Sequence, residues 1–385
     1  MSYNLLHYPT GTGYSRKTHL KYVVNSYHPD LFMVCELESQ SGSNEILNYV
    51  LATPDNRYAA ATFHYNSSST YQELQQMVYY NVQKLELVAE TYLLAYVRDI
   101  NHYTFKLRTQ EASSTPVFID VYVAHFKSSG GTNNENTRRD MAQVFTDDLY
   151  NIPSGHHVVF AGDFNLYRST EPAYQELMNT ANAIVMKDPV NRAGYWHNNS
   201  SFQDIHSQST HVNGDNTFVG GGLDDRFDFI LLSNQTFSAP ELHYVSNSYA
   251  VYGNNGNCFN KAITNSSCSG NFDTVLRGHL YDTSDHLPVV LELQSNQTPL
   301  SINTYYANNT YRINEGNIIK NYISISPKNY EKLHLRILNI LGQELLDVQE
   351  YTGEKIFVGQ MKQGIYFLNV EYKNTYQIIR FIKEN

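Results

Sequence analysis

The stretch Val158-Val159-Phe160-Ala161-Gly162-Asp163-Phe164-Asn165 runs from four apolar residues into a glycine, a carboxylate and an amide. A short apolar run that stops at a turn residue predicts a buried β-strand, here over residues 158–161. Polar side chains that directly follow such a strand are held at the edge of the sheet by a rigid element. The stretch therefore predicts a buried strand whose end carries groups that can do chemistry.

Polar residues adjoin other apolar runs in the same way. The full set is Asn4, Glu36, His125, Asp163, Asn165, Asp228, Asp285 and His286. Carboxylates and amides are hard ligands, typical of magnesium or calcium sites, and no Cys/His grouping indicates zinc. An ion held by Glu36 and Asp285 could neutralise a phosphate and stabilise its transition state. His286 could take a proton from water if Asp228 orients its imidazole.

The first 295 residues alternate short apolar runs with amphipathic stretches. One expected helix carries Met141, Phe145 and Leu149 at a helical spacing, which is typical of a helix that rests on a sheet. The expected helices cover residues 16–27, 45–51 and 134–150, and the expected strands cover residues 31–36, 74–80, 85–90, 117–125, 158–161, 227–232 and 287–293. This interleaving predicts a layered α/β or α+β sandwich.

The composition changes near Gln294. Residues 296–312 are polar, rich in Asn and Tyr, and read as a linker. Residues 313–385 contain strand-length runs without a helical stripe, which predicts a small all-β sandwich. The expected organisation is therefore a larger domain over 1–295, a linker over 296–312 and a β-domain over 313–385.

Composition and charge exclude two classes of protein. The 385 residues are 41% hydrophobic and 17% charged, with a net charge of −10, which suits a folded globular protein. The part before residue 299 holds 17 basic and 29 acidic side chains, a net charge of −12, which excludes a general basic coat for nucleic acid. No apolar run approaches the roughly 18 residues of a bilayer span, which excludes an integral membrane protein.

The three cysteines and the low charge bear on the compartment. Cys35 lies in an apolar run and is expected to be a buried small hydrophobe, whereas Cys258 and Cys268 flank a polar loop. Their spacing permits a disulfide without deciding between a bridge and two free thiols. Low charge with many neutral polar residues favours an extracellular protein. We expect that a signal peptide, if the protein is exported, is not part of this sequence.

The polar motifs, in this order, resemble those of the endonuclease/exonuclease/phosphatase superfamily, which includes deoxyribonuclease I, abasic-site endonucleases, bacterial sphingomyelinases and inositol-polyphosphate phosphatases. The resemblance covers residues 1–295, and its most specific segments are Gly162-Asp163-Phe164-Asn165 and Ser284-Asp285-His286. It implies a four-layer α/β sandwich of the deoxyribonuclease I type with a divalent ion at the sheet edge. The expected ion is magnesium, with calcium or manganese as alternatives.

The resemblance also implies a role for each acidic or amide residue of the set. Glu36 would be the main metal ligand, with Asn4 and Asp285 near it. Asp163 and Asn165 would hold the nucleophile and the phosphate. Taken singly, an Asn after a strand is usually turn chemistry, so the roles depend on the ordered set.

The histidines and two basic residues complete the expected site. His286 paired with Asp228 would be the catalytic base, and His125 would donate to the phosphate or the leaving oxygen. A charged Asp228 among apolar residues needs a partner, which favours this pair. Lys127 and Arg226 could bind phosphate, although exposed basic side chains are usually only solvated.

Several other residues keep two readings. Arg277 could join a groove that holds a nucleic-acid backbone. For Arg138 and Arg139, on the expected helix 134–150, surface salt bridges are at least as good an interpretation. Trp196 could stack on a base or a lipid headgroup, but packing within its loop is the simpler role. Glu38 and Asp225 lie beside stronger candidates and could support them or have no role.

The carboxy-terminal part has a second resemblance. Leu338-Asn339-Ile340-Leu341-Gly342, Gly364-Ile365-Tyr366-Phe367 and Arg380-Phe381-Ile382-Lys383 are similar to segments of the sorting domain of the Bacteroidetes type IX secretion system. Lys320-Asn321-Tyr322 replaces the Asn-Pro expected at its start, and a carbohydrate-binding or adhesive β-sandwich is the alternative. The resemblance implies a secreted or surface protein that meets the type IX machinery.

These expectations lead to one first function and three alternatives. The first is a secreted, metal-dependent endonuclease that hydrolyses DNA, with RNA as a further substrate. The second is a sphingomyelinase-like phospholipid phosphodiesterase, which would need an exposed aromatic hairpin to engage a membrane. Another phosphoesterase with a different substrate is the third, and the fourth is a non-catalytic surface-binding protein, against which the complete polar set counts.

Overall fold

The computed structural model describes residues 1–53, 56–67, 74–215, 217–300, 311–327, 332–340, 342–372 and 375–384. The chain divides into two compact units: the larger contains Met1–Ala52 and Arg57–Leu300, and the smaller contains Ser301–Asn385. Most of the expected linker, residues 301–310, lies outside the described residues.

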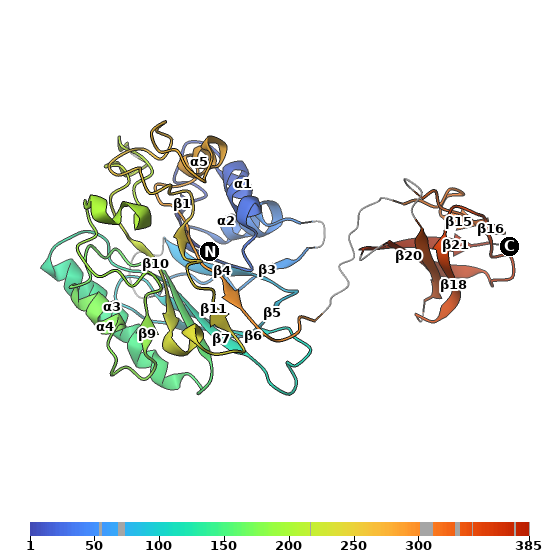
Figure 1. The fold of residues 1–385 in the computed structure, drawn as a ribbon, viewed down its shortest axis with the longest axis horizontal. Coiled ribbons are helices and arrows are strands. Elements are labelled where there is room, and N and C mark those ends of the chain that lie inside the picture. Colours follow the sequence, from blue (N-terminus) through green and yellow to red (C-terminus); the bar gives the residue numbers. More distant parts are fainter. Residues whose placement is uncertain are drawn as a thin grey trace. The chain divides into compact units, whose positions relative to one another are not determined.

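Two six-stranded sheets form the larger unit (Figure 1). The first has the order β12-β13-β1-β2-β4-β3 and the second the order β5-β6-β7-β8-β10-β9. The strands of the first sheet are β1 (Ser2–Tyr8), β2 (Leu31–Leu37), β3 (Tyr58–Ala60), β4 (Gln75–Asn81), β12 (Ala250–Val251) and β13 (Val289–Val290). Those of the second are β5 (Leu85–Leu93), β6 (Ile100–Leu107), β7 (Phe118–His125), β8 (His157–Asp163), β9 (Met186–Lys187) and β10 (Asp228–Ser233).

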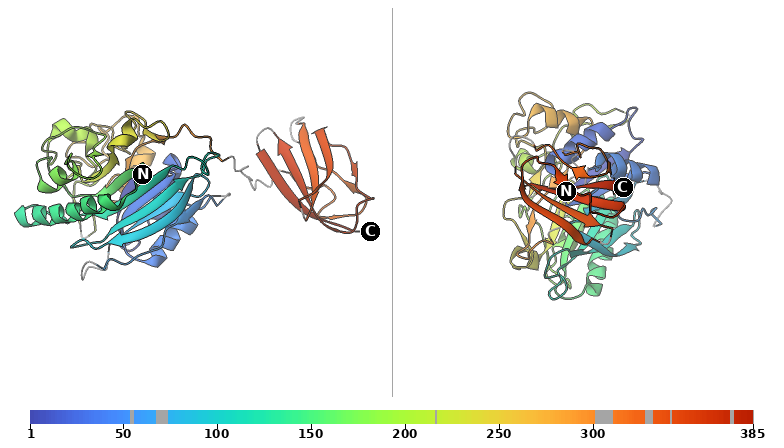
Figure 2. Two further views of the ribbon diagram at one scale, coloured as in Figure 1. Left: turned by 90° about the horizontal axis from the view of Figure 1, so that it is seen from below. Right: turned by 90° about the vertical axis from the view of Figure 1, so that its right-hand side faces the viewer.

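Helices lie outside both sheets, as the left view in Figure 2 shows. On the side of the first sheet lie α1 (Lys17–Tyr27), α2 (Gln40–Glu45), the π-helical turn Ile46–Val50 and α5 (Thr274–Tyr281); on the side of the second lie α3 (Thr132–Asp148) and α4 (Pro172–Leu177). Short 3-10 turns cover Leu149–Asn151, Ser200–Ile205 and Asn234–Phe237, and β11 (His243–Tyr244) pairs with β14 (Leu293–Gln294). This confirms the expected four-layer sandwich.

Two apolar cores hold the layers together. The larger core joins α1 and the first sheet to the inner face of the second sheet, for example through Leu20, Phe32 and Val121. The other core packs Met141 and Phe145 of α3 against the outer face of the second sheet. The helical spacing that predicted α3 therefore reflects its contact with the sheet.

Some elements differ from the sequence-based expectations. The segments expected to be strands over 74–80 and 85–90 are β4 and β5, but they belong to different sheets, so their short connection crosses from one sheet to the other. The helix expected over 45–51 begins at Gln40 and continues as the π-helical turn. The strand expected over 287–293 consists of the two-residue strands β13 (paired with β1 and β12) and β14 (paired with β11). Pro288, which has no N–H to donate to a ladder, precedes β13. The strand β6 and the short helices α4 and α5 were not expected.

Strand direction brings the polar strand ends together. The pairs β1/β2 and β7/β8 are parallel, with Asn4 opposite Cys35 and His125 opposite Asp163. The strand β10 runs antiparallel to β8 and begins with Asp228 opposite Asp163. The ends of strands from both sheets therefore carry the polar set to one edge of the sandwich.

The buried Arg16 fixes the backbone next to this edge. Its Nη1 donates to the carbonyls of Leu5, at 2.7 Å, and Thr283, at 2.8 Å, and its Nη2 donates to that of Leu6, at 2.7 Å. These bonds satisfy carbonyls that the end of β1 leaves unpaired and connect them to the segment before Asp285. Arg16 thus connects the end of β1 to the segment that contains Thr283, next to the polar edge.

All three cysteines and the tryptophan are in well-defined environments that decide between their alternative roles. Cys258 and Cys268 form a disulfide, and Cys35 is buried with its thiol against the carbonyl of Ala124. Trp196 is fully buried, with an exposed fraction of 0%, so it packs within its loop and offers no surface for stacking.

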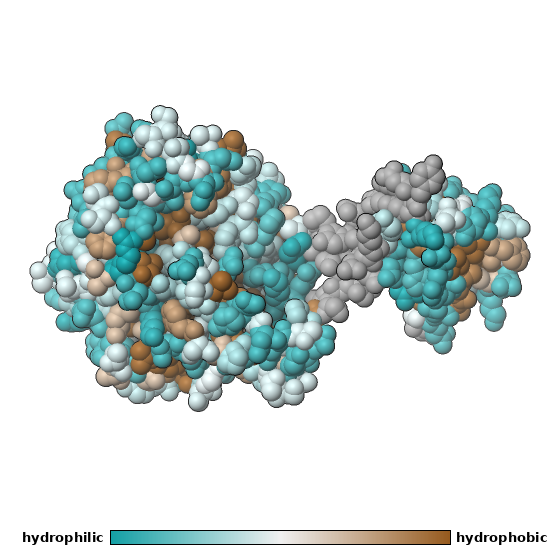
Figure 3. All heavy atoms as spheres, viewed as in Figure 1, coloured by the Kyte–Doolittle hydropathy of each residue, from teal (hydrophilic) through white to brown (hydrophobic). Residues whose placement is uncertain are grey.

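The smaller unit is all-β. One sheet has the order β15-β21-β20-β17-β18, and the pair β16/β19 stands apart. The strands are β15 (Ile318–Ile319), β16 (Tyr322–Ile323), β17 (Leu333–Asn339), β18 (Glu344–Tyr351), β19 (Ile356–Phe357), β20 (Gly364–Tyr372) and β21 (Thr375–Lys383). Ile382 is paired with Ile318 on one side and Ile365 on the other, and all three side chains are at least 40% exposed. Figure 3 shows hydrophobic side chains on the surface of this unit.

In the part of the chain that the structure describes, no helix combines the length and the apolar character needed to cross a membrane.

Gly162 is a position where the fold demands glycine. Its φ is +145°, and a Cβ there would lie 1.8 Å from the carbonyl oxygen of Ala124 on β7. We expect Gly162→Ala to lower the free energy of unfolding by about 3 kcal/mol, because β7 and β8 must separate. Chemical denaturation followed by circular dichroism measures this change.

Gly278→Ala is the matched control. Gly278 lies inside α5, where a Cβ meets nothing within 4 Å, so the alanine should raise stability by about 0.5–1 kcal/mol. Equal stability of wild type and Gly162→Ala would contradict the close approach of β7 and β8.

Candidate active site

An amide links two carboxylates at the centre of the polar edge. The Nδ2 of Asn4 donates to Oε1 of Glu36, at 2.9 Å, and to Oδ2 of Asp163, at 3.0 Å. Its Oδ1 accepts the backbone N–H of Leu6 at 3.0 Å, which fixes which end of the amide faces the acids. Asn4 and Glu36 belong to the first sheet and Asp163 to the second, so this contact spans the sandwich.

An irregular backbone aims Glu36 at this centre. Its φ is +59°, and the register between β1 and β2 shifts between Asn4 and Tyr8. The backbone N–H of His7 donates to Oε2 of Glu36 at 3.1 Å. A non-glycine residue in this conformation is strained, which is common where a side chain must be held for function.

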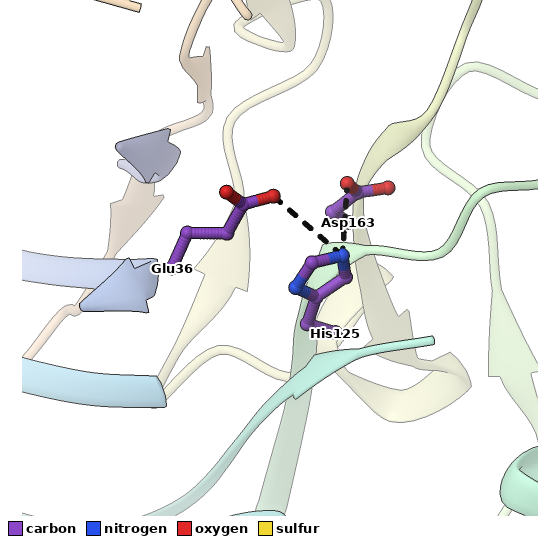
Figure 4. A group of neighbouring side chains, drawn as sticks. All are labelled: Glu36, His125 and Asp163. Atoms are coloured by element: carbon purple, nitrogen blue, oxygen red, sulfur yellow. Dashed lines mark ion pairs between the residues drawn. The ribbon is translucent and has the colours of Figure 1, made fainter. Parts of the chain in front are cut away.

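His125 faces the same two carboxylates (Figure 4). Its Nε2 lies 3.5 Å from Oδ2 of Asp163 and 3.8 Å from Oε1 of Glu36. Burial, followed by the charge of Arg98, holds the pKa of His125 well below its usual range, so the ring is neutral near pH 7. Its Nδ1 is buried and has no hydrogen-bond partner among the described residues.

His286 and Asp228 form a buried pair on the other side of Asp163. The Nδ1 of His286 lies 2.7 Å from Oδ2 of Asp228, which also accepts a hydrogen bond from the Ser207 hydroxyl at 2.7 Å. The Nε2 of His286 lies 3.8 Å from Oδ2 of Asp163. Burial alone would lower the pKa of His286, but the neighbouring carboxylates, Asp228 first, raise it well above its usual value.

Asp285 has one occupied and one open carboxylate oxygen. Its Oδ2 accepts hydrogen bonds from the Gln208 amide, at 3.3 Å, and from the backbone N–H of Val219, at 3.2 Å. Its Oδ1 is buried without a hydrogen-bond partner in the described part of the chain. Burial raises the pKa of Asp285 above its usual value.

Asn165 completes the expected set. It has a φ of +51°, and its backbone N–H donates to Oδ1 of Asp163 at 3.0 Å. Its side-chain amide lies 3.3 Å from the carbonyl of Phe126. The turn at the end of β8 is thus fixed by Asp163 itself, as an Asx turn would be.

The donor set fits a hard divalent cation. Ligand atoms of Glu36, His125 and Asp163 all lie within 4.8 Å of one another. Burial, together with the charges of Asp228 and Glu36, raises the pKa of Asp163 to about 7. Keeping these buried carboxylates ionised therefore costs free energy. A cation held by these groups would relieve that cost, and the open Oδ1 of Asp285 offers a further oxygen ligand. The structure therefore places His125 next to the expected ligand Glu36.

A second group capable of holding a metal contains His197, Asp224 and Asp225. The Nδ1 of His197 lies 2.6 Å from Oδ1 of Asp225. Burial raises the pKa of Asp225 to about 6. Asp225, expected only as a supporting residue, thus has a histidine partner.

The structure does not bring Arg226 to the site. Arg226 is 1% exposed, and its Nη1 and Nη2 each lie 2.8 Å from an oxygen of Asp188, so it cannot bind phosphate as expected. Arg277 is also buried, and its guanidinium donates to the carbonyls of Ile263, Asn265 and Phe272. Of the expected backbone contacts, only Lys127 stays partly exposed next to the site.

The two arginines of α3 differ from each other. Arg138 is fully buried, and its Nη2 lies 2.7 Å from Glu171, so it is not a surface salt bridge. Arg139 is exposed and pairs with Asp140. Neither is placed at the polar edge.

Sequence reasoning missed Gln208 and His7. The Nε2 of Gln208 lies 2.8 Å from Nε2 of His286, and His7 lies between Glu36 and Glu38, with Nδ1 3.2 Å from Glu38. Gln208 stands in a polar loop without apolar periodicity, so no local signal marks it. His7 is three residues after Asn4, which is the one sequence signal that could have found it.

Comparison with solved structures identifies the fold. A protein described as the endonuclease/exonuclease/phosphatase from Bacteroides vulgatus superposes with a TM-score of 0.50 at 17% identity, covering 76% of this chain and 97% of its own. The larger unit has the endonuclease/exonuclease/phosphatase fold. Other solved structures that match are D. rerio TDP2 complexed with a single-strand DNA product (TM-score 0.47, 15% identity, 76% of this chain and 97% of that chain covered) and the Bacteroides thetaiotaomicron mannosyl-6-phosphatase Bt3783 (TM-score 0.46, 14% identity, 76% and 98% covered). No curated protein is significantly similar to the chain.

The smaller unit is identified by sequence. Residues 317–384 match the family model of the secretion system C-terminal sorting domain. This confirms the second resemblance, and it indicates export to the cell surface or beyond. The chain therefore joins an endonuclease/exonuclease/phosphatase fold to a sorting domain.

The carboxylate cluster generates a metal-binding prediction. We expect the protein to bind Mg²⁺, Ca²⁺ or Mn²⁺, and Glu36→Gln to weaken that binding at least about tenfold, because it removes a charged oxygen ligand. Isothermal titration calorimetry on both proteins measures the affinities.

Glu38→Gln is the control for this measurement. Glu38 is two residues away and is bound by His7 and Thr10, outside the ligand group. Equal affinity in wild type and Glu36→Gln, or an equal loss in both variants, would refute the assignment of Glu36.

Proposed function

We propose that the chain is an exported, divalent-cation-dependent phosphoester hydrolase, and that its substrate is the phosphodiester backbone of DNA, with RNA as a further substrate. The observation that carries the proposal is the His286–Asp228 pair at 2.7 Å beside the Glu36–Asn4–Asp163 cluster. A buried base with an orienting carboxylate, next to ligands for a hard cation, is the arrangement that attack of water on a phosphate requires.

The residues divide the work of hydrolysis. Asp228 holds Nδ1 of His286 so that Nε2 faces the site, and Nε2 of the neutral ring takes a proton from the attacking water. Because the neighbouring acids raise the pKa of His286, a cation bound among them would lower that pKa and favour the neutral form. The water oxygen bonds to phosphorus, the P–O ester bond breaks, and the leaving oxygen takes a proton from solvent to become an alcohol. His286 then returns its proton to solvent. Asn165 and His125 adjoin Asp163, where they can contact the phosphoryl oxygens. A divalent cation, when bound, would neutralise charge on the phosphate.

A second candidate follows from the missing basic contacts. Arg226 and Arg277 are committed to other partners, and the part of the chain before residue 299 has a net charge of −12. A long polyanion gains little attraction from such a surface, whereas a single phosphate group needs only the site itself. A small phosphoester is therefore the alternative substrate.

The smaller unit has no part in this chemistry. We propose that it directs the hydrolase to the type IX secretion machinery. The enzyme would then act at the cell surface or in the medium on phosphoesters from outside the cell.

Removal of the base should abolish turnover. We expect His286→Ala to reduce kcat by about 10³-fold or more, and Asp228→Asn by about 10²-fold, because the asparagine leaves the imidazole without its charged partner. Relaxation of supercoiled plasmid with Mg²⁺, with Ca²⁺ and with chelator is the assay. Arg139→Ala, on the exposed face of α3, is the control and should keep full activity.

A substrate panel separates the candidates. Supercoiled plasmid, single-stranded RNA, sphingomyelin and a sugar phosphate are incubated with wild type and His286→Ala. Plasmid cleavage that needs both the metal and His286 supports the endonuclease. Release of inorganic phosphate from the sugar phosphate with intact plasmid would replace it by the second candidate, and hydrolysis of sphingomyelin alone by a phospholipid phosphodiesterase. Equal cleavage by wild type and His286→Ala would reject the assigned base.

A further inference from the structure

Gln208 is the partly exposed member of an otherwise buried segment, residues 205–211. Its backbone is pinned: the N–H donates to the carbonyl of Asp225 at 3.1 Å, and its carbonyl accepts the N–H groups of Asp224 and Asp225 at 2.9 and 2.8 Å. An isolated bridge also pairs Gln208 with His286. A fixed backbone therefore presents one flexible amide to the site.

When His286 is neutral, the form in which it acts as a base, the two hydrogens of this amide are shared between its ring nitrogen and an acid. The Nε2 of Gln208 lies 2.8 Å from Nε2 of His286 and 3.3 Å from Oδ2 of Asp285. Since the carboxylate can only accept, the amide nitrogen is the end that faces both groups. Nδ1 of His286 faces Asp228, so the amide covers the ring nitrogen left for the attacking water.

Water and the amide cannot occupy that place together. A separation of 2.8 Å leaves no room for a water molecule between Gln208 and His286. When water binds to Nε2 of His286, the amide must turn away from it. Asp285 Oδ2 already accepts the N–H of Val219, so the strongest new acceptor nearby is an oxygen of the phosphoryl group that the water attacks.

We propose that Gln208 is a substrate-contacting residue whose side-chain N–H donates to a non-bridging phosphoryl oxygen once water takes its place on His286. The inference rests on the proposed function and adds a neutral donor to a site built mostly of acids. An amide suits this position because a lysine would form an ion pair with Asp285, whereas the amide is free to move to the phosphate. Donation to oxygens that gain charge in the transition state raises kcat.

Gln208→Ala and Gln208→Glu test the proposal. The glutamate keeps the length of the side chain but has no N–H to donate. We expect both variants to lose about 10²-fold in kcat, with KM changed less than about threefold. Both should also bind inorganic phosphate at least about tenfold more weakly in the presence of Mg²⁺. Gln208→Ala should keep its affinity for Mg²⁺ and its unfolding midpoint, and Gln203→Ala, in the 3-10 turn Ser200–Ile205, is the control.

The outcomes separate Gln208 from the proposed function. Hydrolysis and phosphate affinity that persist in Gln208→Ala would overturn the role of Gln208 and leave the function standing. A lower unfolding midpoint with unchanged phosphate affinity would also overturn it, because Gln208 would then be structural. Wild type that hydrolyses no phosphoester but binds phosphate through Gln208 would reject the function and keep the site. Wild type that neither hydrolyses phosphoesters nor binds phosphate would overturn both.

Discussion

The candidate active site depends on one amide. Asn4 gives its two hydrogens to carboxylates from two different sheets, Glu36 and Asp163, while its oxygen is held by the backbone of Leu6. Without that amide, two buried acids would face each other across the sandwich with little to offset their repulsion. The sandwich can therefore bring acids together at this edge because a neutral donor separates them.

The other buried acids near Asn4 also have hydrogen-bond partners that offset their negative charge. Asp228 is paired with His286, and Asp285 is bonded by Gln208 and by a backbone N–H. Burial, followed by the charges of Asp228 and Glu36, still raises the pKa of Asp163. Behind this layer, Arg16 holds the carbonyls at the end of β1, so its positive charge is kept on the backbone side of the site. The arrangement favours a cation from solution over a cationic side chain at the centre.

Much of this could be predicted from the sequence because strand ends leave local marks. Apolar runs followed by Glu36 and Asp163 identify both the strands and the polar edge, and parallel pairing with their neighbours brings further polar strand residues there. The sequence carries no comparable signal for which sheet a strand belongs to. The connection between β4 and β5 looks local, yet it crosses the sandwich. Arg226 was expected to bind phosphate because nothing near it in the sequence marks its partner, Asp188, which is 38 residues earlier in the chain. Gln208 likewise reaches His286 from a loop with no periodicity.

The buried Trp196 makes the larger unit observable on its own. It is the only tryptophan of the chain, and it packs against Tyr174 and Phe229, with the guanidinium of Arg226 5.1 Å from its ring. Tryptophan fluorescence therefore reports the unfolding of the larger unit, while the sorting domain contributes only tyrosine emission. Two melting transitions in one sample can thus be assigned without separating the units.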